Sequence, residues 1–204
     1  QQQDAGRGGV TRIAHLSDLH FGFHRSELVE PLLDRVNAAR ADLVVVTGDV
    51  THRARPAQYS QAAAFLSRIE APVMVIPGNH DVPLYNLPVR FLMPWRGFRR
   101  AISPQLTPCR QIGRVRVMGL NSVDPSAVQR GIIRDGEIAR LEHSLDPEAM
   151  NIVAVHHPLE HLAQVDKELS RRAPEALARL DRAGAQIALS GHLHVWATGA
   201  MLDQ

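Results

Sequence analysis

The fold of this chain is decided by the stretch Leu43-Val44-Val45-Val46-Thr47-Gly48-Asp49. An uninterrupted apolar run is typical of a strand that is buried on both faces, as the strands of a parallel sheet are. Gly48 then lets the chain turn sharply, because glycine adopts backbone conformations that other residues avoid. The stretch therefore predicts a buried strand that ends by presenting the carboxylate of Asp49 at the edge of a sheet.

The same arrangement, an apolar run followed by a polar cluster, flanks this stretch on both sides. The upstream run leads into Ser17-Asp18-Leu19-His20, and the downstream run leads into Gly78-Asn79-His80-Asp81. Apolar residues recur at helical spacing between the runs, which predicts parallel strands covered by helices. The expected elements are strands over 11–16 and 73–76 and helices over 28–39 and 56–69.

The second half of the chain departs from this rhythm. Segment 83–108 mixes aromatic residues, prolines and arginines, and it predicts an inserted, cap-like and partly helical segment. After it, apolar runs and turn residues predict a β-hairpin, two more strands and two helices. The strands are expected over 110–112, 115–120, 152–155, which ends at His156, and 187–189, which leads into Gly191. One helix is expected from Asp135, which can cap it, and another from Pro174 to Gly184.

Composition limits the class of protein. The chain has 204 residues, of which 45% are hydrophobic and 22% charged, as expected for one globular domain. Net charge is only +2 and acidic residues are interspersed with the arginines, which argues against binding of long nucleic acid. Cys109 is the only cysteine, which fits a cytoplasmic setting, and no apolar run is long enough for a membrane span. Residues 1–9 are polar and glycine-rich, and we expect a disordered lead-in before a domain over 10–204.

Polar clusters at strand ends are the chemical signal of this sequence. The strand ends of an α/β sheet converge on one crevice, so side chains that are distant in sequence can meet there. Carboxylate and amide oxygens suit divalent cations, and imidazole favours Mn, Fe, Zn or Ni. We therefore predict a site for two divalent metal ions, with Asp49 as the natural bridge between them. The clusters are Asp18-x-His20, Gly48-Asp49, Gly78-Asn79-His80-Asp81, His156-His157-Pro158 and Gly191-His192-x-His194, and Gly78 and Gly191, like Gly48, are expected to allow a sharp turn.

These clusters, in this order, resemble the pattern of the calcineurin-like metallophosphoesterase superfamily, which is D-x-H, G-D, G-N-H-D/E, H and G-H-x-H. The sequence looks closest to the bacterial branch that contains the class III cyclic-nucleotide phosphodiesterases, in the details His15-Leu16-Ser17-Asp18-Leu19-His20 and Gly78-Asn79-His80-Asp81. The resemblance covers residues 18–194 and implies an α/β fold, a four-layer α-β-β-α sandwich of two mixed sheets with a dinuclear metal site at the strand ends. Family members usually continue further, so we expect either a compact branch, with one more strand over 195–202, or a chain truncated at its C-terminus.

The resemblance also implies a role for each matched residue. His80 would face the scissile phosphate, and Asp81 would either orient His80 or close the turn. His156 is chosen over His157 because the family places this histidine two residues before a proline. The metal ligands would be Asp18, His20 and His194 at the first ion, Asn79, His156 and His192 at the second, and Asp49 at both.

The implied activity is metal-dependent hydrolysis of a phosphate ester, most simply a small-molecule phosphodiester such as a cyclic nucleotide, by a metal-activated water with His80 assisting. A nuclease or a nucleotide-lipid pyrophosphatase is the alternative, and a non-catalytic protein-binding scaffold is a third reading, which the full ligand set disfavours. The sequence leaves the oligomeric state open. Further candidates for substrate contact, for which a structural or surface role is the simpler explanation, are His52, Arg53, Asn121 and the aromatic and arginine residues of 83–101.

Overall fold

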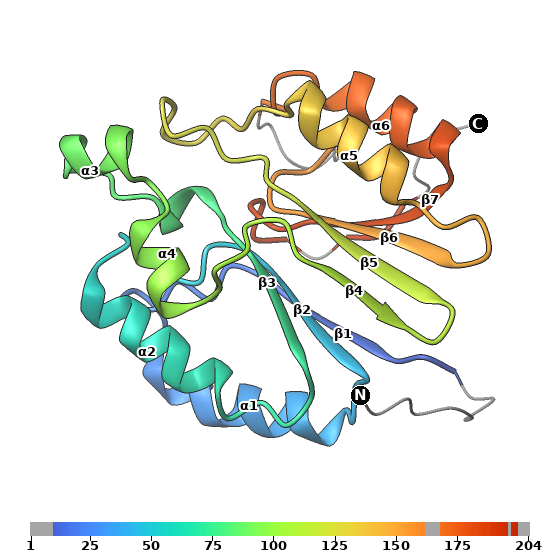
Figure 1. Cartoon of the computed structure of the whole chain (residues 1–204). Helices are drawn as coiled ribbons and strands as arrows, with labels where there is room; N and C mark the ends of the chain where they lie inside the picture. Colours follow the sequence, from blue (N-terminus) through green and yellow to red (C-terminus); the bar gives the residue numbers. More distant parts are fainter. Residues whose placement is uncertain (1–9, 162–167, 196, 200–204) are drawn as a thin grey trace.

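A computed structural model of the protein describes residues 10–161, 168–195 and 197–199 (Figure 1). The first half of the chain forms a three-stranded sheet in the order β1-β2-β3, and both strand pairs are parallel. Helical crossovers connect the strands, as the apolar periodicity predicts. The elements are β1 (Ile13–Leu16), a short 3₁₀ turn η1 (Ser26–Leu28), α1 (Val29–Ala38), β2 (Leu43–Thr47), α2 (Pro56–Leu66), β3 (Val73–Ile76) and η2 (Asn79–Asp81).

The second half forms a four-stranded sheet in the order β4-β5-β6-β7. β4 and β5 pair antiparallel as the predicted hairpin, and the remaining pairs are parallel. Both predicted helices are present, and the second ends at Gly184, whose φ of 100° is the left-handed conformation that favours glycine at a helix end. The elements are β4 (Cys109–Ile112), β5 (Val115–Leu120), α5 (Asp135–Ser144), β6 (Met150–Val155), α6 (Ala173–Ala183) and β7 (Ala185–Leu189).

The two sheets face each other and helices cover both outer faces, so the predicted four-layer sandwich is confirmed (Figure 1). Alternate residues of each strand serve the two faces. In β2, Leu43 and Val45 pack against Val117 and Ile152 of the other sheet, whereas Val44 and Val46 belong to the apolar cluster formed with α1 and α2. One detail of the implied fold is wrong: within the described residues the first sheet is entirely parallel, and only the second sheet is mixed. The first is parallel because its strands are joined through helices, and a tight hairpin joins only β4 to β5.

Segment 83–108 contains two short helices, α3 (Leu87–Leu92) and α4 (Arg96–Ala101). α4 lies against α2, and Phe98 is fully buried in the same apolar cluster as α2. α3 stands further from the sheets, and Phe91 on it is exposed (Figure 1). The aromatic residues of the segment are therefore divided between packing and exposure, so only some of them can reach a ligand.

The structure corrects one smaller expectation and leaves others untouched. Asp135 does not cap α5, because Arg134 occupies the N-cap and the Asp135 carboxylate pairs with Arg172 instead. The lead-in predicted over 1–9 lies outside the described residues, as does most of the strand predicted over 195–202. Within the described part of the chain, no helix combines the length and the apolar character needed to cross a bilayer.

Candidate metal centre

The carboxyl ends of β1, β2, β3, β6 and β7 meet at one edge of the sandwich, where all five polar clusters come together. The backbone amide of His192 donates to Asp18 Oδ2 over 2.9 Å, and the rings of His20 and His194 approach to 3.1 Å between their Nε2 atoms. These contacts join the beginning of the chain to its end. The structure therefore brings together every side chain that the sequence proposes as a ligand, and it does so across both sheets.

A first group of donor atoms comes from Asp18, His20 and His194. Asp18 Oδ1 lies 3.3 Å from His194 Nε2 and 3.8 Å from His20 Nε2, and the three ligand atoms lie within 4.8 Å of one another. Asp18 Oδ1 is buried and has no hydrogen-bond partner among the described residues. A buried carboxylate oxygen without a donor is costly, so this position suits a cation.

A second group is formed by His156 and Asn79. His156 Nδ1 donates to the carbonyl of Thr47 over 2.8 Å, which in the neutral ring leaves a lone pair on Nε2. The Asn79 amide donates through Nδ2 to the carbonyl of Val128, so Oδ1 is the atom that lies 3.0 Å from His156 Nε2. Two acceptors at this distance repel unless a proton or a cation lies between them.

The electrostatics of His156 agree with this geometry. Burial alone would lower the pKa of His156, but the adjacent carboxylate of Asp49 raises it to about 9. A positive charge at Nε2 is thus strongly favoured. A metal ion can take the place of that proton, since metal ligands bind in their deprotonated form.

Asp49 lies between the two groups. Its Oδ2 is 3.4 Å from His156 Nε2 and 3.8 Å from His20 Nε2, while Oδ1 accepts from the backbone amide of His80 at 2.8 Å. The side chain is buried, which by itself would raise the pKa of Asp49, but His156 and His80 hold that pKa well below the usual range. The carboxylate therefore stays charged with one oxygen facing both groups, as a bridging ligand requires.

His157 differs from its neighbour in how its nitrogens are used. Its Nδ1 contacts Ser122 Oγ and its Nε2 contacts the carbonyl of Gln129, both at 2.8 Å, and burial lowers its pKa well below the usual value. Because both ring nitrogens contact other protein groups, His157 lines the site and has no ring nitrogen left to offer a metal ion. His192 lies beside both histidines, 5.2 Å from the His156 ring and 4.6 Å from the His157 ring between centroids.

The backbone is strained where the ligands lie. Left-handed φ values between 46° and 70° occur at five of the proposed ligands, a conformation that costs non-glycine residues about 1–3 kcal/mol each. Such strain clusters at functional sites. The strained residues are Asp18, His20, Asp49, His192 and His194.

The glycines act differently from the prediction. Only Gly48 has a positive φ, of 88°, whereas Gly78 and Gly191 have ordinary backbone angles. These two glycines are needed because a side chain would not fit. A Cβ on Gly78 would overlap the amide nitrogen and Oδ1 of Asp49, and a Cβ on Gly191 would overlap Ser17 Oγ. The sharp turns after these strands are therefore made by the ligands, and the glycines let neighbouring strand ends approach closely.

Gly78→Ala is expected to displace Asp49, lower the metal content and destabilise the fold by about 1–3 kcal/mol, the usual cost of overpacking. Thermal melts and metal analysis of the purified variant check this. Gly136→Ala is the matched control, because nothing lies within 4 Å of that position and alanine favours the surrounding helix α5. Equal melting temperatures and metal contents for the two variants would show that Gly78 does not position Asp49.

His80 and Asp81 follow the third strand and have distinct environments. His80 Nδ1 donates to the carbonyl of His52 over 2.7 Å, and the His80 ring lies edge-on to His20 with 4.8 Å between centroids. Asp81 is fully buried and accepts from the amides of Gly78 and Thr51 at 3.0 and 2.9 Å. Burial raises the pKa of Asp81 to about 6. These contacts tie the turn after β3 to the loop after β2, so they support the turn-closing alternative for Asp81.

Two side chains near the site, Phe23 and Tyr85, belong to none of the sequence motifs. Phe23 stacks on His52 with 4.8 Å between ring centroids although 76% of it is exposed, and Tyr85 accepts from Arg53 over 2.6 Å. Their only signal in the sequence is closeness to a motif, Phe23 after His20 and Tyr85 after Asp81. Asn121, in contrast, accepts locally from the amide of Val123, which fits its structural reading.

Comparison with known proteins identifies the family of this chain. The sequence model of the calcineurin-like phosphoesterase family matches residues 11–196. A probable cyclic nucleotide phosphodiesterase of Vesicomyosocius okutanii is 26% identical over 194 residues, which cover 89% of this chain and 78% of that protein. The glycerophosphodiester phosphodiesterase GpdQ of Enterobacter lignolyticus is 30% identical over 206 residues, with 89% and 70% covered.

Solved structures share the fold. A dimetal phosphatase from Danio rerio matches with a TM-score of 0.64 at 14% identity, over 91% of this chain and 82% of that one. A purple acid phosphatase from yellow lupin also has a TM-score of 0.64, at 16% identity, over 92% of this chain and 38% of that one. The chain therefore belongs to the calcineurin-like phosphoesterase family, and with it to the metal-dependent phosphoric ester hydrolases.

Proposed function

We propose that this protein hydrolyses a small-molecule phosphodiester, such as a cyclic nucleotide, with the help of two divalent cations. The observation that carries the proposal is the position of Asp49, whose Oδ2 faces His156 Nε2 at 3.4 Å and His20 Nε2 at 3.8 Å. One carboxylate shared by two groups of donor atoms is what a two-metal hydrolase needs. The proposed ligands are Asp18, His20, Asp49, Asn79, His156, His192 and His194.

The donor set fits transition metals. Imidazole nitrogens dominate, joined by two carboxylates and one amide oxygen, a mixture that suits Mn, Fe or Zn better than Mg or Ca. Asp18 Oδ1, which accepts no hydrogen bond from the described residues, and the opposed acceptors of His156 and Asn79 are positions where a cation would be stabilising. When bound, two such cations would lower the pKa of a water molecule and neutralise charge on the phosphoryl oxygens.

The chain's own residues would then orient the ester and handle protons. The His52 carbonyl fixes the proton of His80 on Nδ1, so the other ring nitrogen, Nε2, is left for the substrate. As imidazolium, His80 would donate a hydrogen bond from Nε2 to the phosphoryl group or a proton to the leaving oxygen. Asp81 supports this arrangement indirectly, because it holds the turn from which His80 projects.

The relatives support a diester over a monoester. The protein of Vesicomyosocius okutanii is named a probable cyclic nucleotide phosphodiesterase, and GpdQ is named a glycerophosphodiester phosphodiesterase. Both names describe small phosphodiesters. The low net charge of this chain, +2, also favours a small substrate over a long nucleic acid.

A panel of four substrates with added Mn²⁺ tests the proposal: cyclic AMP, bis(p-nitrophenyl) phosphate, p-nitrophenyl phosphate and single-stranded DNA. We expect both small diesters to be hydrolysed faster than the monoester and the DNA. Preferred cleavage of DNA would instead support a nuclease. If no substrate is hydrolysed while the metals are bound, the proposed function is wrong and a binding role for the fold gains support.

A further inference from the structure

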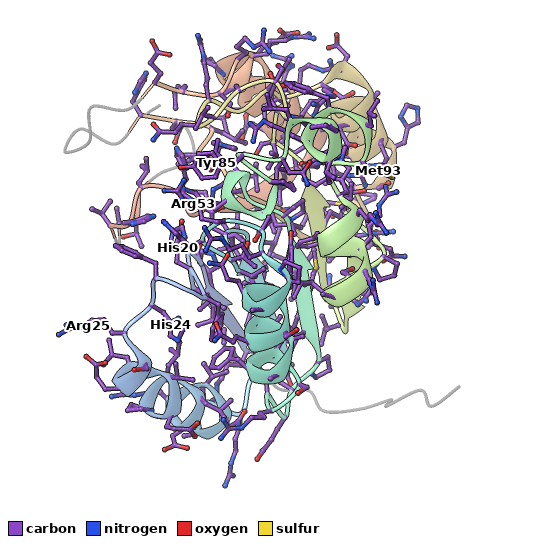
Figure 2. All side chains as sticks on the ribbon, turned by 90° about the vertical axis from the view of Figure 1, so that its left-hand side faces the viewer. His20, His24, Arg25, Arg53, Tyr85 and Met93 are labelled. Atoms are coloured by element: carbon purple, nitrogen blue, oxygen red, sulfur yellow. The ribbon has the colours of Figure 1, made fainter. Side chains whose placement is uncertain are left out.

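A large cavity lies beside the metal centre, between α2 and the segment that carries α3 and α4. Its volume is about 780 Å³, within the range of about 300–1,000 Å³ that is typical of small-molecule sites. Figure 2 shows Arg53, which lines it, between Tyr85 and the ligand residue His20. The polar residues that matter most in its lining are Arg53, Arg55, Tyr59, Tyr85, Arg96 and Arg100, and we call it the arginine cavity.

The charge of this cavity is uncompensated. Four arginines line it, and no aspartate or glutamate does. Elsewhere in the described residues arginines commonly pair with carboxylates, as Arg68 does with Glu30 and Arg179 with Glu142. None of the four cavity arginines makes such a pair within the described part of the chain. Clustered guanidinium groups without acidic partners attract and bind anions.

Apolar surface accounts for the rest of the lining. Leu84, Val89 and Ala101 line the cavity, and the Tyr85 ring is 73% exposed while its hydroxyl accepts from Arg53. An exposed tyrosine ring held in this way offers a rigid surface on which an apolar or aromatic group can pack. The cavity is therefore suited to a ligand with an anionic end and an apolar or aromatic body.

Arg53 and its neighbour connect this cavity to the catalytic side. The Arg53 guanidinium donates from Nε to His52 Nε2 over 3.2 Å, and the His52 ring stacks on His80 with 5.3 Å between centroids. His52 also lies 5.8 Å from His20 between ring centroids. Arg53 in the cavity lining and His52 beside His20 and His80 are consecutive and in contact, so the cavity and the catalytic side are adjacent.

We propose that the arginine cavity binds the part of the substrate beyond the scissile phosphodiester and selects substrates with a second anionic group, a phosphate or carboxylate, on an apolar or aromatic body. This inference rests on the proposed phosphodiesterase function. Arg96 and Arg100 are the main contacts for the second anion, because residues four apart on α4 lie on one face and both line the cavity. Arg53 orients the substrate between the two sites.

Two chromogenic phosphodiesters that differ in one group test the proposal: thymidine 5′-(p-nitrophenyl phosphate) and the same compound with a 3′-phosphate. For the unaltered protein we expect the KM of the 3′-phosphorylated substrate to be about tenfold lower, since a hydrogen bond to a charged group is worth at least that factor. The double variant Arg96→Ala/Arg100→Ala should lose this difference, so that its KM values for the two substrates become equal. The single variant Arg96→Gln gives the same test with less change in size.

Arg99→Ala is the matched control, because Arg99 lies on α4 between the two arginines, is exposed and does not line the cavity. It should keep the tenfold difference. Equal KM values for the two substrates in the unaltered protein would overturn the proposal, as would an equal loss in Arg99→Ala, which would indicate a general effect of surface charge. Thermal melts of each variant verify that it is folded.

A binding measurement separates this proposal from the proposed function. Isothermal titration with thymidine 3′,5′-bisphosphate needs no turnover, and we expect affinity to fall about tenfold in the double variant but not in Arg99→Ala. If neither chromogenic substrate is hydrolysed but this difference in affinity is seen, the proposed reaction is wrong and the anion site stands. Equal affinity of the unaltered protein and the double variant would overturn the anion site itself.

Discussion

Replacing Asp49 by alanine is expected to remove both cations and to reduce phosphodiester hydrolysis by more than about 100-fold. Substituting a residue that only orients a metal ligand costs up to about 100-fold, and loss of a bridging ligand should cost more. The reason is that Asp49 Oδ2 faces donor atoms of both groups at once, His156 Nε2 at 3.4 Å and His20 Nε2 at 3.8 Å. Its other oxygen holds the backbone amide of His80, so the turn would also loosen. Elemental analysis and a phosphodiesterase assay on the same preparation measure both effects.

Two variants accompany this experiment. Asp34→Ala removes an exposed carboxylate from α1 and should leave metal content and turnover unchanged. Asp49→Asn keeps the shape and an oxygen that can accept from His80, so it should fold better than Asp49→Ala while still binding metal poorly. Two retained metal equivalents in Asp49→Ala would refute the bridging role.

His80→Ala is expected to leave the metal content near that of the unaltered protein and to lower turnover by about 10²–10⁴-fold, the usual range for a general acid. His80 contributes no atom to the groups around Asp18 and Asp49, and its Nδ1 is held by the His52 carbonyl. The substitution should therefore lower turnover without lowering the metal content. Steady-state assays and elemental analysis check this, with His143→Ala on the exposed face of α5 as the control.

The identity of the leaving group shows how His80 acts. If His80 protonates the leaving oxygen, the loss of turnover should be larger for cyclic AMP, whose leaving group is a ribose alkoxide. It should be smaller for bis(p-nitrophenyl) phosphate, which releases a stable phenolate. If His80 stabilises charge on the phosphoryl group, the two losses should be similar. Unchanged turnover of both substrates with metals bound would remove His80 from the mechanism.

The strands were predictable because their apolar runs are long and uninterrupted. Leu43 to Val46 can only be buried on both faces, and burial on both faces in turn requires helices and a second sheet around them. The ligand set was equally accessible, because each ligand directly follows such a strand. The parallel pairing of the first sheet was predicted by the same reasoning, since helices join its strands, whereas the family resemblance had implied a mixed sheet.

What the sequence could not give depends on contacts between distant segments. Nothing near Gly78 indicates that its Cα must fit against Asp49, so the expected role of this glycine was a turn. The arginine cavity likewise requires Arg53, from the loop after β2, to meet Arg96 and Arg100 on α4. The pattern around each arginine is unremarkable, and only the packing of α4 on α2 brings them together.

The left-handed backbone at Asp18, His20, Asp49, His192 and His194 has a consequence for engineering. Glycine would fit each of these positions with less strain, so a library screened only for heat resistance should enrich glycine there and return inactive proteins. At these five positions, selection for thermal stability would then favour glycine, whereas selection for activity would favour the metal ligand. A more stable variant that keeps its activity has to be sought at positions away from these five ligands.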